Sequence, residues 1–263
     1  MTALSSGIKS FITHRELLFA WTSRIIRARY QQSLLGGLWA VLQPAATVAI
    51  FTVIFTRFIR VNTGDIPYVV FSYSAMVPWI MFSTSITDMV DSLVLNMNLI
   101  TKIYFPREIL VTAALLARLL DFVIAFLMLV VLMVFYRIPV FTPAWIFLPA
   151  VILVQLLLAL GIGLAGSALY VFSRDIKHLV ALGLQLWFYA TPIIYPVDLV
   201  PQQWLFAYHL NPMAGVIEAY RDILIHGSAP GPYLTISALI AIVVIAVSYV
   251  FFTKVQSTFA DII

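Results

Sequence analysis

AWIFLPAVILVQLLLALGIGLAGSALYVF, residues 144–172, contains 29 positions and no charged side chain. A helix needs about 20 apolar residues to cross the ~30 Å hydrocarbon core of a bilayer, so this stretch is long enough to span one. The whole chain has the same character, with 63% hydrophobic and 10% charged residues. Barrel strands would alternate polar and apolar residues in runs of about ten, which the sequence does not do. We therefore predict an all-α integral membrane protein.

Further apolar runs before and after this stretch predict a single transmembrane domain over residues 1–263, with six spans. They cover residues 34–56, 67–92, 109–136, 144–172, 179–195 and 233–253. The fifth run is close to the lower length limit for a spanning helix. Pro44, Pro78 and Pro192 are expected to interrupt or bend the first, second and fifth spans.

The basic residues predict the orientation of these spans. Ten of the 15 Lys and Arg residues fall on the side that carries both termini and four on the other side, while Arg118 lies within a span. Cytoplasmic loops carry the excess of Lys and Arg, so both termini are expected in the cytoplasm. Basic residues distributed in this way do not indicate a nucleic-acid partner. The N-terminus lacks a short apolar core followed by a cleavage site, so we expect no removable signal peptide.

Residues 8–30 predict an amphipathic helix that lies in the cytoplasmic interface, against membrane lipids. At 3.6 residues per turn the stripe of Phe11, Leu18, Trp21 and Ile25 falls opposite Glu16, Ser23 and Arg27. Basic residues of such a helix lie near anionic headgroups. The alternative is a basic segment that only fixes the topology.

Two connections are longer or more apolar than simple turns. The inner loop 96–108 could form a short helix that a soluble partner grips, or it could be an ordinary solvated loop. The outer connection 196–232 carries too much apolar surface for a solvated loop, and Asn211 and Pro212 divide it in two. It predicts two short outer helices, which protein or a watery cavity must satisfy at their ends. Such helices could gate a pathway from outside.

Motifs for catalysis, cofactors and metals are missing from the sequence. It contains no phosphate loop G-x-x-x-x-G-K-[ST], no H-E-x-x-H and no cysteine, and its four histidines are far apart. We expect no catalytic, cofactor or metal site in this chain. Gly161, Gly163 and Gly166 match G-x-G-x-x-G, but they lie inside a span with no preceding strand. Small residues there favour close helix packing.

Charged residues inside the membrane must face the bundle, because they are costly in lipid. Arg118 and Asp121 share one helix face by their three-residue spacing, as an ion pair or as part of a transport path. Asp88 and Asp91 share a face near the inner boundary and are expected to be solvated or paired with bases of the inner loop. Aromatic residues gather in the outer half, as an interfacial belt or as a glycan lining.

Residues 24–44, RIIRARYQQSLLGGLWAVLQP, closely resemble the beginning of the first span in permeases of type-2 ABC exporters for polysaccharides. The likeness continues in IYFPREIL at 103–110, SRDI at 173–176 and TPIIYP at 191–196, and in Asn211-Pro212 with Tyr220-Arg221. It extends over nearly the whole chain. The members that it most resembles export O-antigen, capsule or teichoic acid chains carried on a lipid.

This resemblance implies a permease, not an enzyme, that forms a homodimer in the inner (plasma) membrane above two copies of a separate cytoplasmic ATPase. ATP and Mg would bind to that ATPase. The substrate would be a lipid-linked polysaccharide, with O-antigen as the favoured candidate before teichoic acid or capsule. The implied ATPase-coupling residues are Arg24, Arg27, Arg29, Asn98, Lys102, Phe105, Pro106, Arg107 and Glu108. The first and fifth spans would line the path, with channel and gate residues Trp39, Trp187, Tyr189, Tyr195, Trp204, Tyr208, Asn211 and Pro212.

Two other classes of membrane protein are alternatives to a permease of a polysaccharide exporter. An ion-coupled secondary transporter would use Arg118 and Asp121 as its coupling charges. This class predicts inverted repeats and helices broken at the midplane of the membrane, and the sequence shows no convincing repeat. A membrane enzyme for lipid-linked sugars would need carboxylates and histidines clustered at one face. The outer set Asp198, His209, Glu218 and Asp222 looks too scattered in sequence for that role.

Overall fold

A computed structural model describes residues 13–31, 34–58, 64, 66–103 and 105–260, and within these ranges the regular elements are all helical. Five helical segments are long and apolar enough to cross a membrane: Gly36–Phe58, Tyr68–Leu95, Glu108–Phe135, Pro143–Phe172 and Tyr233–Phe259. They agree with five of the six predicted spans. The prediction of an all-helical membrane fold is thus confirmed at this level.

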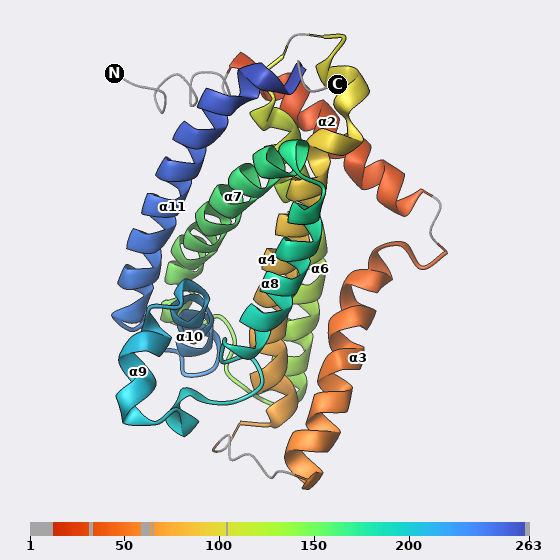
Figure 1. Cartoon of the computed structure of the whole chain (residues 1–263). Helices are drawn as coiled ribbons and strands as arrows, with labels where there is room; N and C mark the ends of the chain where they lie inside the picture. The colour runs from red at the N-terminus through yellow and green to blue at the C-terminus, as the bar shows by residue number, and fades with distance from the viewer. Residues whose placement is uncertain (1–12, 32–33, 59–63, 65, 104, 261–263) are drawn as a thin grey trace.

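The long segments carry the following labels. The first consists of η1 (Gly36–Leu38), α3 (Trp39–Val53) and the π-helical turn η2 (Ile54–Phe58); the next are α4 (Tyr68–Leu95) and α6 (Glu108–Phe135). After η3 (Pro143–Phe147) comes α7 (Leu148–Phe172), and α11 (Tyr233–Val255) ends in η5 (Gln256–Ala260). Figure 1 shows α4, α6, α7 and α11 side by side, with α3 along one edge.

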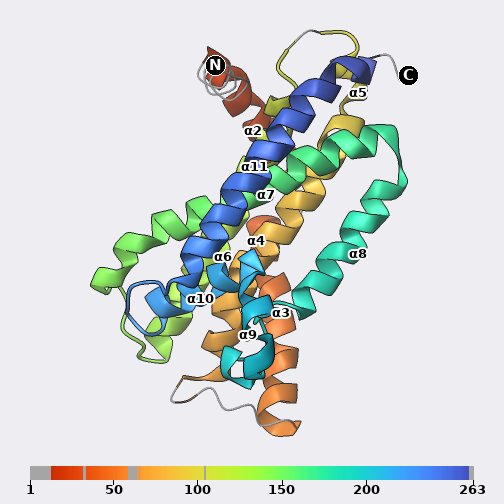
Figure 2. The ribbon, with the colours of Figure 1, turned by 60° about the vertical axis from the view of Figure 1, so that its left-hand side comes forward.

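The predicted fifth span corresponds to α8 (Asp175–Tyr189), a helix of 15 residues. At 1.5 Å per residue it is about 22 Å long, shorter than the hydrocarbon core. The helix ends before Pro192, and the chain continues in turns. α8 stands at the edge of the bundle in Figure 2, and none of its residues is buried.

Helix α4 is the centre of the bundle, since it packs against both α6 and α7 and most of its residues are buried. Small residues allow this close packing. A Cβ added at Gly161 of α7 would lie 2.9 Å from the backbone nitrogen of Ile245 in α11. One added at Gly166 would lie 2.7 Å from a methyl group of Val90 in α4. The interpretation of the glycine motif as a packing surface is confirmed.

Helix α2 (Arg15–Tyr30) lies across one end of the bundle and packs against α6 (Figure 1). The predicted interface helix began at residue 8, and residues 8–12, with Phe11 of the apolar stripe, lie outside the described residues. Within the described part, Leu18, Trp21 and Ile25 are half-buried and Arg27 is exposed. The short helix α5 (Met97–Ile100) lies in the inner loop at the same end.

The outer connection contains η4 (Val197–Leu199), α9 (Gln202–His209) and α10 (Pro212–Leu224). Asn211 caps α10 by accepting a hydrogen bond from the Met213 backbone at 3.0 Å, and Pro212 occupies the first turn. Most of α10 is buried within the bundle. Gln155 of α7 accepts a hydrogen bond from the Tyr220 hydroxyl at 2.9 Å and donates one to the Pro78 carbonyl at 2.9 Å. α10 is therefore part of the core.

Candidate functional site

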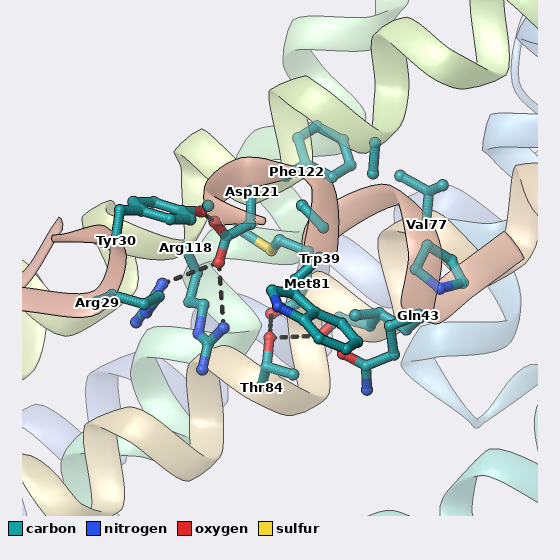
Figure 3. Close-up of a pocket in the computed structure, with 15 residues that line it drawn as sticks. Arg29, Tyr30, Trp39, Gln43, Val77, Met81, Thr84, Arg118, Asp121 and Phe122 are labelled. Carbon is teal, nitrogen blue, oxygen red and sulfur yellow. Dashed lines mark hydrogen bonds and ion pairs between the residues drawn. The ribbon is translucent and has the colours of Figure 1, made fainter. Parts of the chain in front are cut away.

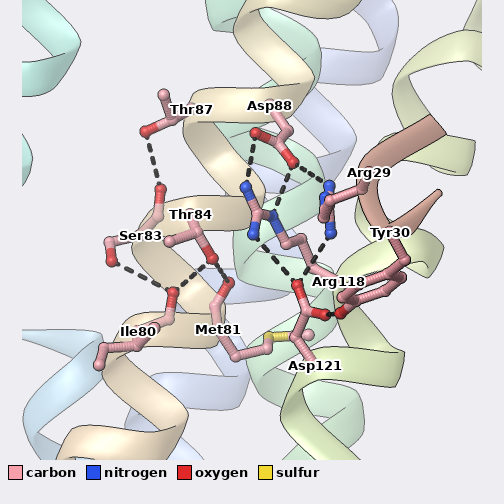
Figure 4. Close-up of polar contacts among 10 residues, drawn as sticks. All are labelled: Arg29, Tyr30, Ile80, Met81, Ser83, Thr84, Thr87, Asp88, Arg118 and Asp121. Atoms are coloured by element: carbon pink, nitrogen blue, oxygen red, sulfur yellow. Dashed lines mark hydrogen bonds and ion pairs between the residues drawn. The ribbon is translucent and has the colours of Figure 1, made fainter. Parts of the chain in front are cut away.

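Four charged side chains from three helices meet near the end of the bundle where α2 lies; Arg29, Asp88, Arg118 and Asp121 are called the ionic cluster below. Arg29 of α2 donates to Asp88 of α4 at 2.7 Å and to Asp121 of α6 at 2.8 Å. Arg118 donates to Asp88 at 2.6 and 3.0 Å and to Asp121 at 3.1 Å. Figure 4 shows the two guanidinium groups between the two carboxylates. The hydroxyl of Tyr30 also donates to Asp121.

The ionic cluster is balanced in charge and ties α2 to the two neighbouring spans. Its side chains keep 17 to 27% of their surface exposed. Arg118 and Asp121 share one helix face and form an ion pair, the first of the two alternatives for these residues. Asp88 pairs with Arg29 and Arg118 instead of with bases of the inner loop. Asp91 pairs with Lys177 at the start of α8, at 2.8 Å.

A cavity of about 110 Å³ lies beside the ionic cluster (Figure 3). Trp39 and Gln43 of α3 face it from one side, and Thr84 of α4 and Phe122 of α6 contribute from the other. Of the predicted channel residues, Trp39 is thus next to the ionic cluster. The arrangement brings together the first span, the central helix and α2.

The nine predicted coupling residues divide into an exposed group and a packed group. Arg24, Arg27, Asn98 and Lys102 are exposed at the end of the bundle that carries α2 and α5. Phe105, Pro106, Arg107 and Glu108 are partly or fully buried at the start of α6, and Arg29 belongs to the ionic cluster. The Arg107 guanidinium lies 5.6 Å from the centre of the Phe259 ring. Tyr104 lies outside the described residues.

Asn211 joins the end of α8 to the start of α10. Its side-chain oxygen accepts from the Trp187 indole at 2.7 Å, and its amide donates to the Thr191 hydroxyl at 3.0 Å. The amide also donates to the Ala190 carbonyl at 3.1 Å. Trp187 further packs edge-on against Phe82 of α4, with ring centres 5.3 Å apart. These contacts make a fixed joint, here called the Asn211 joint.

The remaining predicted gate residues do not meet at this joint. Trp204 of α9 and Tyr189 of α8 are exposed, and Tyr208 is half-buried. The Tyr195 hydroxyl donates to the Tyr189 carbonyl at 3.3 Å. The predicted channel and gate set therefore divides into four places: the small cavity, the Asn211 joint, the exposed helix α9, and the Tyr189–Tyr195 contact at the end of α8.

A second cavity, of about 620 Å³, lies between α9, α10 and the start of α11; it is called the outer cavity. Asp198, His209, Glu218 and Asp222 all line it. The expectation that these residues are too scattered to cluster is wrong, because the turn between α9 and α10 folds them around one space. Pairwise spacing in sequence does not reveal this, since the helices run in different directions.

Burial shapes the charges of the outer cavity. It raises the pKa of Glu218 to about 7, an effect that Asp222 reinforces and Arg221 opposes. Burial also lowers the pKa of Arg221 to about 9, and it lowers the pKa of His209. Arg221 donates to the Ile193 carbonyl at 3.1 Å, and its guanidinium lies 3.7 Å from the centre of the Phe71 ring.

Comparison with known proteins agrees with the resemblance seen in residues 24–44. The profile of the family described as ABC-2 type transporter matches residues 16–225. The O-antigen export system permease protein RfbA of Klebsiella pneumoniae is 30% identical over 251 residues, 94% of this chain and 95% of that protein. The protein of the same name in Myxococcus xanthus is 30% identical over 261 residues, 97% and 98% of the two chains.

A more distant relative is the polysialic acid transport protein KpsM of Escherichia coli. It is 25% identical over 207 residues, which cover 78% of this chain and 79% of that protein. The predicted likeness to permeases of polysaccharide exporters is confirmed, and the apolar helices agree with a multi-pass membrane protein. Because the profile covers most of its length, the chain belongs to the ABC-2 type transporter family.

Proposed function

We propose that this chain is the membrane-spanning half of an ATP-driven exporter that carries a lipid-linked polysaccharide, in the first place O-antigen, across the inner membrane. The observation that carries the proposal is the likeness over nearly the full length to two permeases named for O-antigen export. The sequence has no phosphate loop of its own. ATP and Mg would therefore bind to a separate cytoplasmic ATPase, present in two copies beneath a dimer.

Six crossings fit the course of the chain better than five. Helix α2 and the end of α11 lie at the same end of the bundle (Figure 1), which an even number of crossings requires. Helix α8 starts at that end, near the Asp91–Lys177 pair, and leads to the Asn211 joint at the opposite end. We take α8 with the turns that follow it as the fifth crossing. Both termini then lie in the cytoplasm.

A second copy of this chain would cover the exposed faces of α3 and α8. Both helices are apolar, yet α8 buries no residue and α3 buries only Pro44 and Val48 within one subunit. In a homodimer these helices would line a path between the subunits. The polysaccharide would pass along this path, and α9 would be its movable outer gate.

The ionic cluster supports a route for the force that ATP supplies. The exposed bases Arg24, Arg27 and Lys102 offer the ATPase a contact at the inner end. Arg29 follows on the same helix and is bonded to α4 and α6. A push on α2 would therefore reach the central helix directly, while the loop 96–108 would act on the start of α6.

The arrangement disfavours the ion-coupled alternative. A coupling site needs a carboxylate that can exchange its partner for a proton or metal ion during transport. Asp88 and Asp121 each accept hydrogen bonds from both Arg29 and Arg118. Displacing two fixed cations from either carboxylate would be costly.

The test is glycan export by the purified chain in proteoliposomes, with and without the partner ATPase that the proposal requires. We expect transport only with both proteins and ATP. Replacing Pro106 and Arg107 by Ala should leave the assembly intact and its ATP hydrolysis measurable, but reduce export at least about ten-fold, because the two reactions become uncoupled. Full export in that double variant would contradict the coupling surface. Export without any ATPase would contradict the function itself.

A further inference from the structure

The outer cavity has the size and position of a ligand site. Its volume of about 620 Å³ falls within the roughly 300–1,000 Å³ of small-molecule sites. Its walls come from the beginning of α4, the segment around 196–202, helices α9 and α10, and the start of α11. These elements lie at the end of the bundle opposite α2 (Figure 1), which is the outer end in the proposed orientation.

Polar groups of this cavity lack partners within the part of the chain that the structure describes. His209 Nδ1, Glu218 Oε1 and Arg221 Nε are buried and make no hydrogen bond there, and the 3.8 Å between His209 Nδ1 and Glu218 Oε2 is longer than a hydrogen bond. His209 is 6% exposed and Arg221 is 5% exposed. A buried polar atom without a partner costs roughly 1–3 kcal/mol. Three such atoms around one space call for water or a polar ligand.

The charges of the cavity restrict the chemistry of that ligand. The carboxylates of Asp198 and Asp222 outnumber the single guanidinium of Arg221, and the partly ionised Glu218 adds to the negative charge, so phosphates and acidic sugars would be repelled. Among the described residues no group of three His, Asp or Glu side chains could hold a metal ion. Asp222 is held in place by the backbone amide of Gly231, which donates to it at 3.0 Å.

A neutral sugar unit satisfies both the charge and the hydrogen bonds. Each hydroxyl can donate to a carboxylate such as Glu218 and accept from a donor such as Arg221. Leu205 and Tyr233 add an apolar wall for the C–H faces of a sugar ring. The ring of Tyr233 is stacked parallel to that of His209, with centres 3.3 Å apart.

We infer that the outer cavity binds a neutral sugar unit, with Glu218 and Arg221 as its hydrogen-bonding residues and Leu205 and Tyr233 as its apolar wall. This inference rests on the proposed function in one respect, namely that the exported glycan reaches the outer face. It adds a binding site to that function, separate from the path between α3 and α8.

The experiment is saturation-transfer NMR on the complex of the full chain with its ATPase in nanodiscs. The probes are glucose, mannose, rhamnose and N-acetylglucosamine, with sialic acid as the anionic comparison. We expect transfer to at least one neutral sugar and none to sialic acid. Glu218→Gln and Leu205→Trp should each weaken that transfer about five-fold or more, because one replaces the carboxyl group that binds the sugar hydroxyls by an amide and the other fills the cavity. Leu210→Trp is the matched control, since Leu210 is exposed beside α9 and does not line the cavity.

The inference is overturned by a lack of transfer to all four neutral sugars, by stronger transfer to sialic acid, or by equal transfer in Leu205→Trp and Leu210→Trp. If Leu205→Trp does not fold, Glu218→Gln decides alone. Export by the same purified proteins, reconstituted in proteoliposomes, separates the two proposals. ATP-driven export without sugar binding rejects only the site, whereas sugar binding without ATP-dependent export rejects only the proposed function.

Discussion

Asp88 receives hydrogen bonds from two arginines that come from different helices. Asp91, one turn away, receives one from Lys177, whose side chain is 45% exposed. The two aspartates share a helix face and differ in what surrounds them. Asp88, which balances two half-buried arginines, therefore contributes more to the stability of the fold than Asp91, which pairs with a solvated lysine amine.

Asp88→Asn is therefore expected to destabilise the protein by about 1–3 kcal/mol, less than the loss of a fully buried pair because water reaches the ionic cluster. The variant leaves the two guanidinium groups facing one carboxylate. Asp91→Asn is the matched control and should cost under about 1 kcal/mol. Thermal unfolding in detergent measures both. Equal midpoints for the two variants would contradict the ranking.

Glu218 makes stability depend on pH. Burial raises its pKa from 4.5 to about 7, so the folded chain holds this proton more tightly than the unfolded chain. The stability from this group is fully present below about pH 4.5 and is lost as the pH rises through about 7. Glu218→Gln should flatten this decline and stabilise the protein at pH 8 by roughly 1–3 kcal/mol.

The measurement for Glu218 is the unfolding midpoint at pH 5 and pH 8. Glu16→Gln, in the exposed first turn of α2, is the control for removing one carboxylate. The prediction is contradicted if the unfolding midpoint of the wild type rises from pH 5 to pH 8 and that of Glu218→Gln rises equally. The burial of Glu218 would then have no effect on stability.

At the level of elements, the two outer helices have different roles. Helix α10 is fixed by the Asn211 joint at its beginning and by the Tyr220–Gln155 hydrogen bond further along. Helix α9 is mostly exposed and has few contacts of this kind. Any movement that opens the outer end should therefore occur in α9, because α10 cannot move without disturbing α4 and α7.

Gly215→Ala tests the fixed position of α10. A Cβ at Gly215 would lie 2.7 Å from the Tyr233 carbonyl oxygen and would also collide with the Ser237 hydroxyl. Since the first atom belongs to the backbone, α10 and α11 must separate, and we expect a loss of about 1–3 kcal/mol. Gly183→Ala in α8 is the control, because nothing lies within 4 Å of its Cβ position. It should keep or slightly raise the unfolding midpoint, and a larger loss at Gly183 than at Gly215 would argue against a fixed α10.

The double variant Trp204→Ala and Tyr208→Ala tests α9 as a gate. Trp204 is 60% exposed, so its loss should change the stability of the fold little. We expect increased ion leak through reconstituted transporters, or altered export, by a few-fold, with normal membrane insertion. If ion leak and glycan export are both equal to those of the wild type, α9 is not a gate.

A feature of the fold can be predicted from the sequence when its pattern lies within a short stretch of neighbouring residues. The five long spans and the Arg118–Asp121 pair depend on local runs and three-residue spacing, and both were predicted correctly. Asp121 and its partner Arg29 are 92 residues apart, and no local pattern connects them. The outer cavity was missed for the same reason. The burial of α10 was missed because an apolar stripe is the same whether it faces lipid or protein.

For the whole molecule, the proposed dimer has its two copies meeting at the exposed apolar faces of α3 and α8. Leu182 and Leu186 of α8 are 54% and 62% exposed, as are Val243 and Val247 of α11 at 61% and 65%. Exposure alone does not distinguish a face toward lipid from a face toward a second subunit. In the proposed dimer the second copy covers α8, which stands at the edge of the bundle in Figure 2 and packs less extensively on α4 and α7 than α11 packs on α7.

Cysteine crosslinking separates the two faces without background, since the natural sequence contains no cysteine. Leu182→Cys and Leu186→Cys, treated in membranes with a bismaleimide, should give a band at twice the mass of the chain, because in the proposed dimer the two copies of α8 face each other across the path. Val243→Cys and Val247→Cys, the matched controls, should remain monomeric, since their thiols face lipid. Adding ATP should change the yield at α8 about two-fold or more if the path widens during transport. Crosslinking at α11 but not at α8 would place the second copy on the opposite side of the bundle and would remove α3 and α8 from the path.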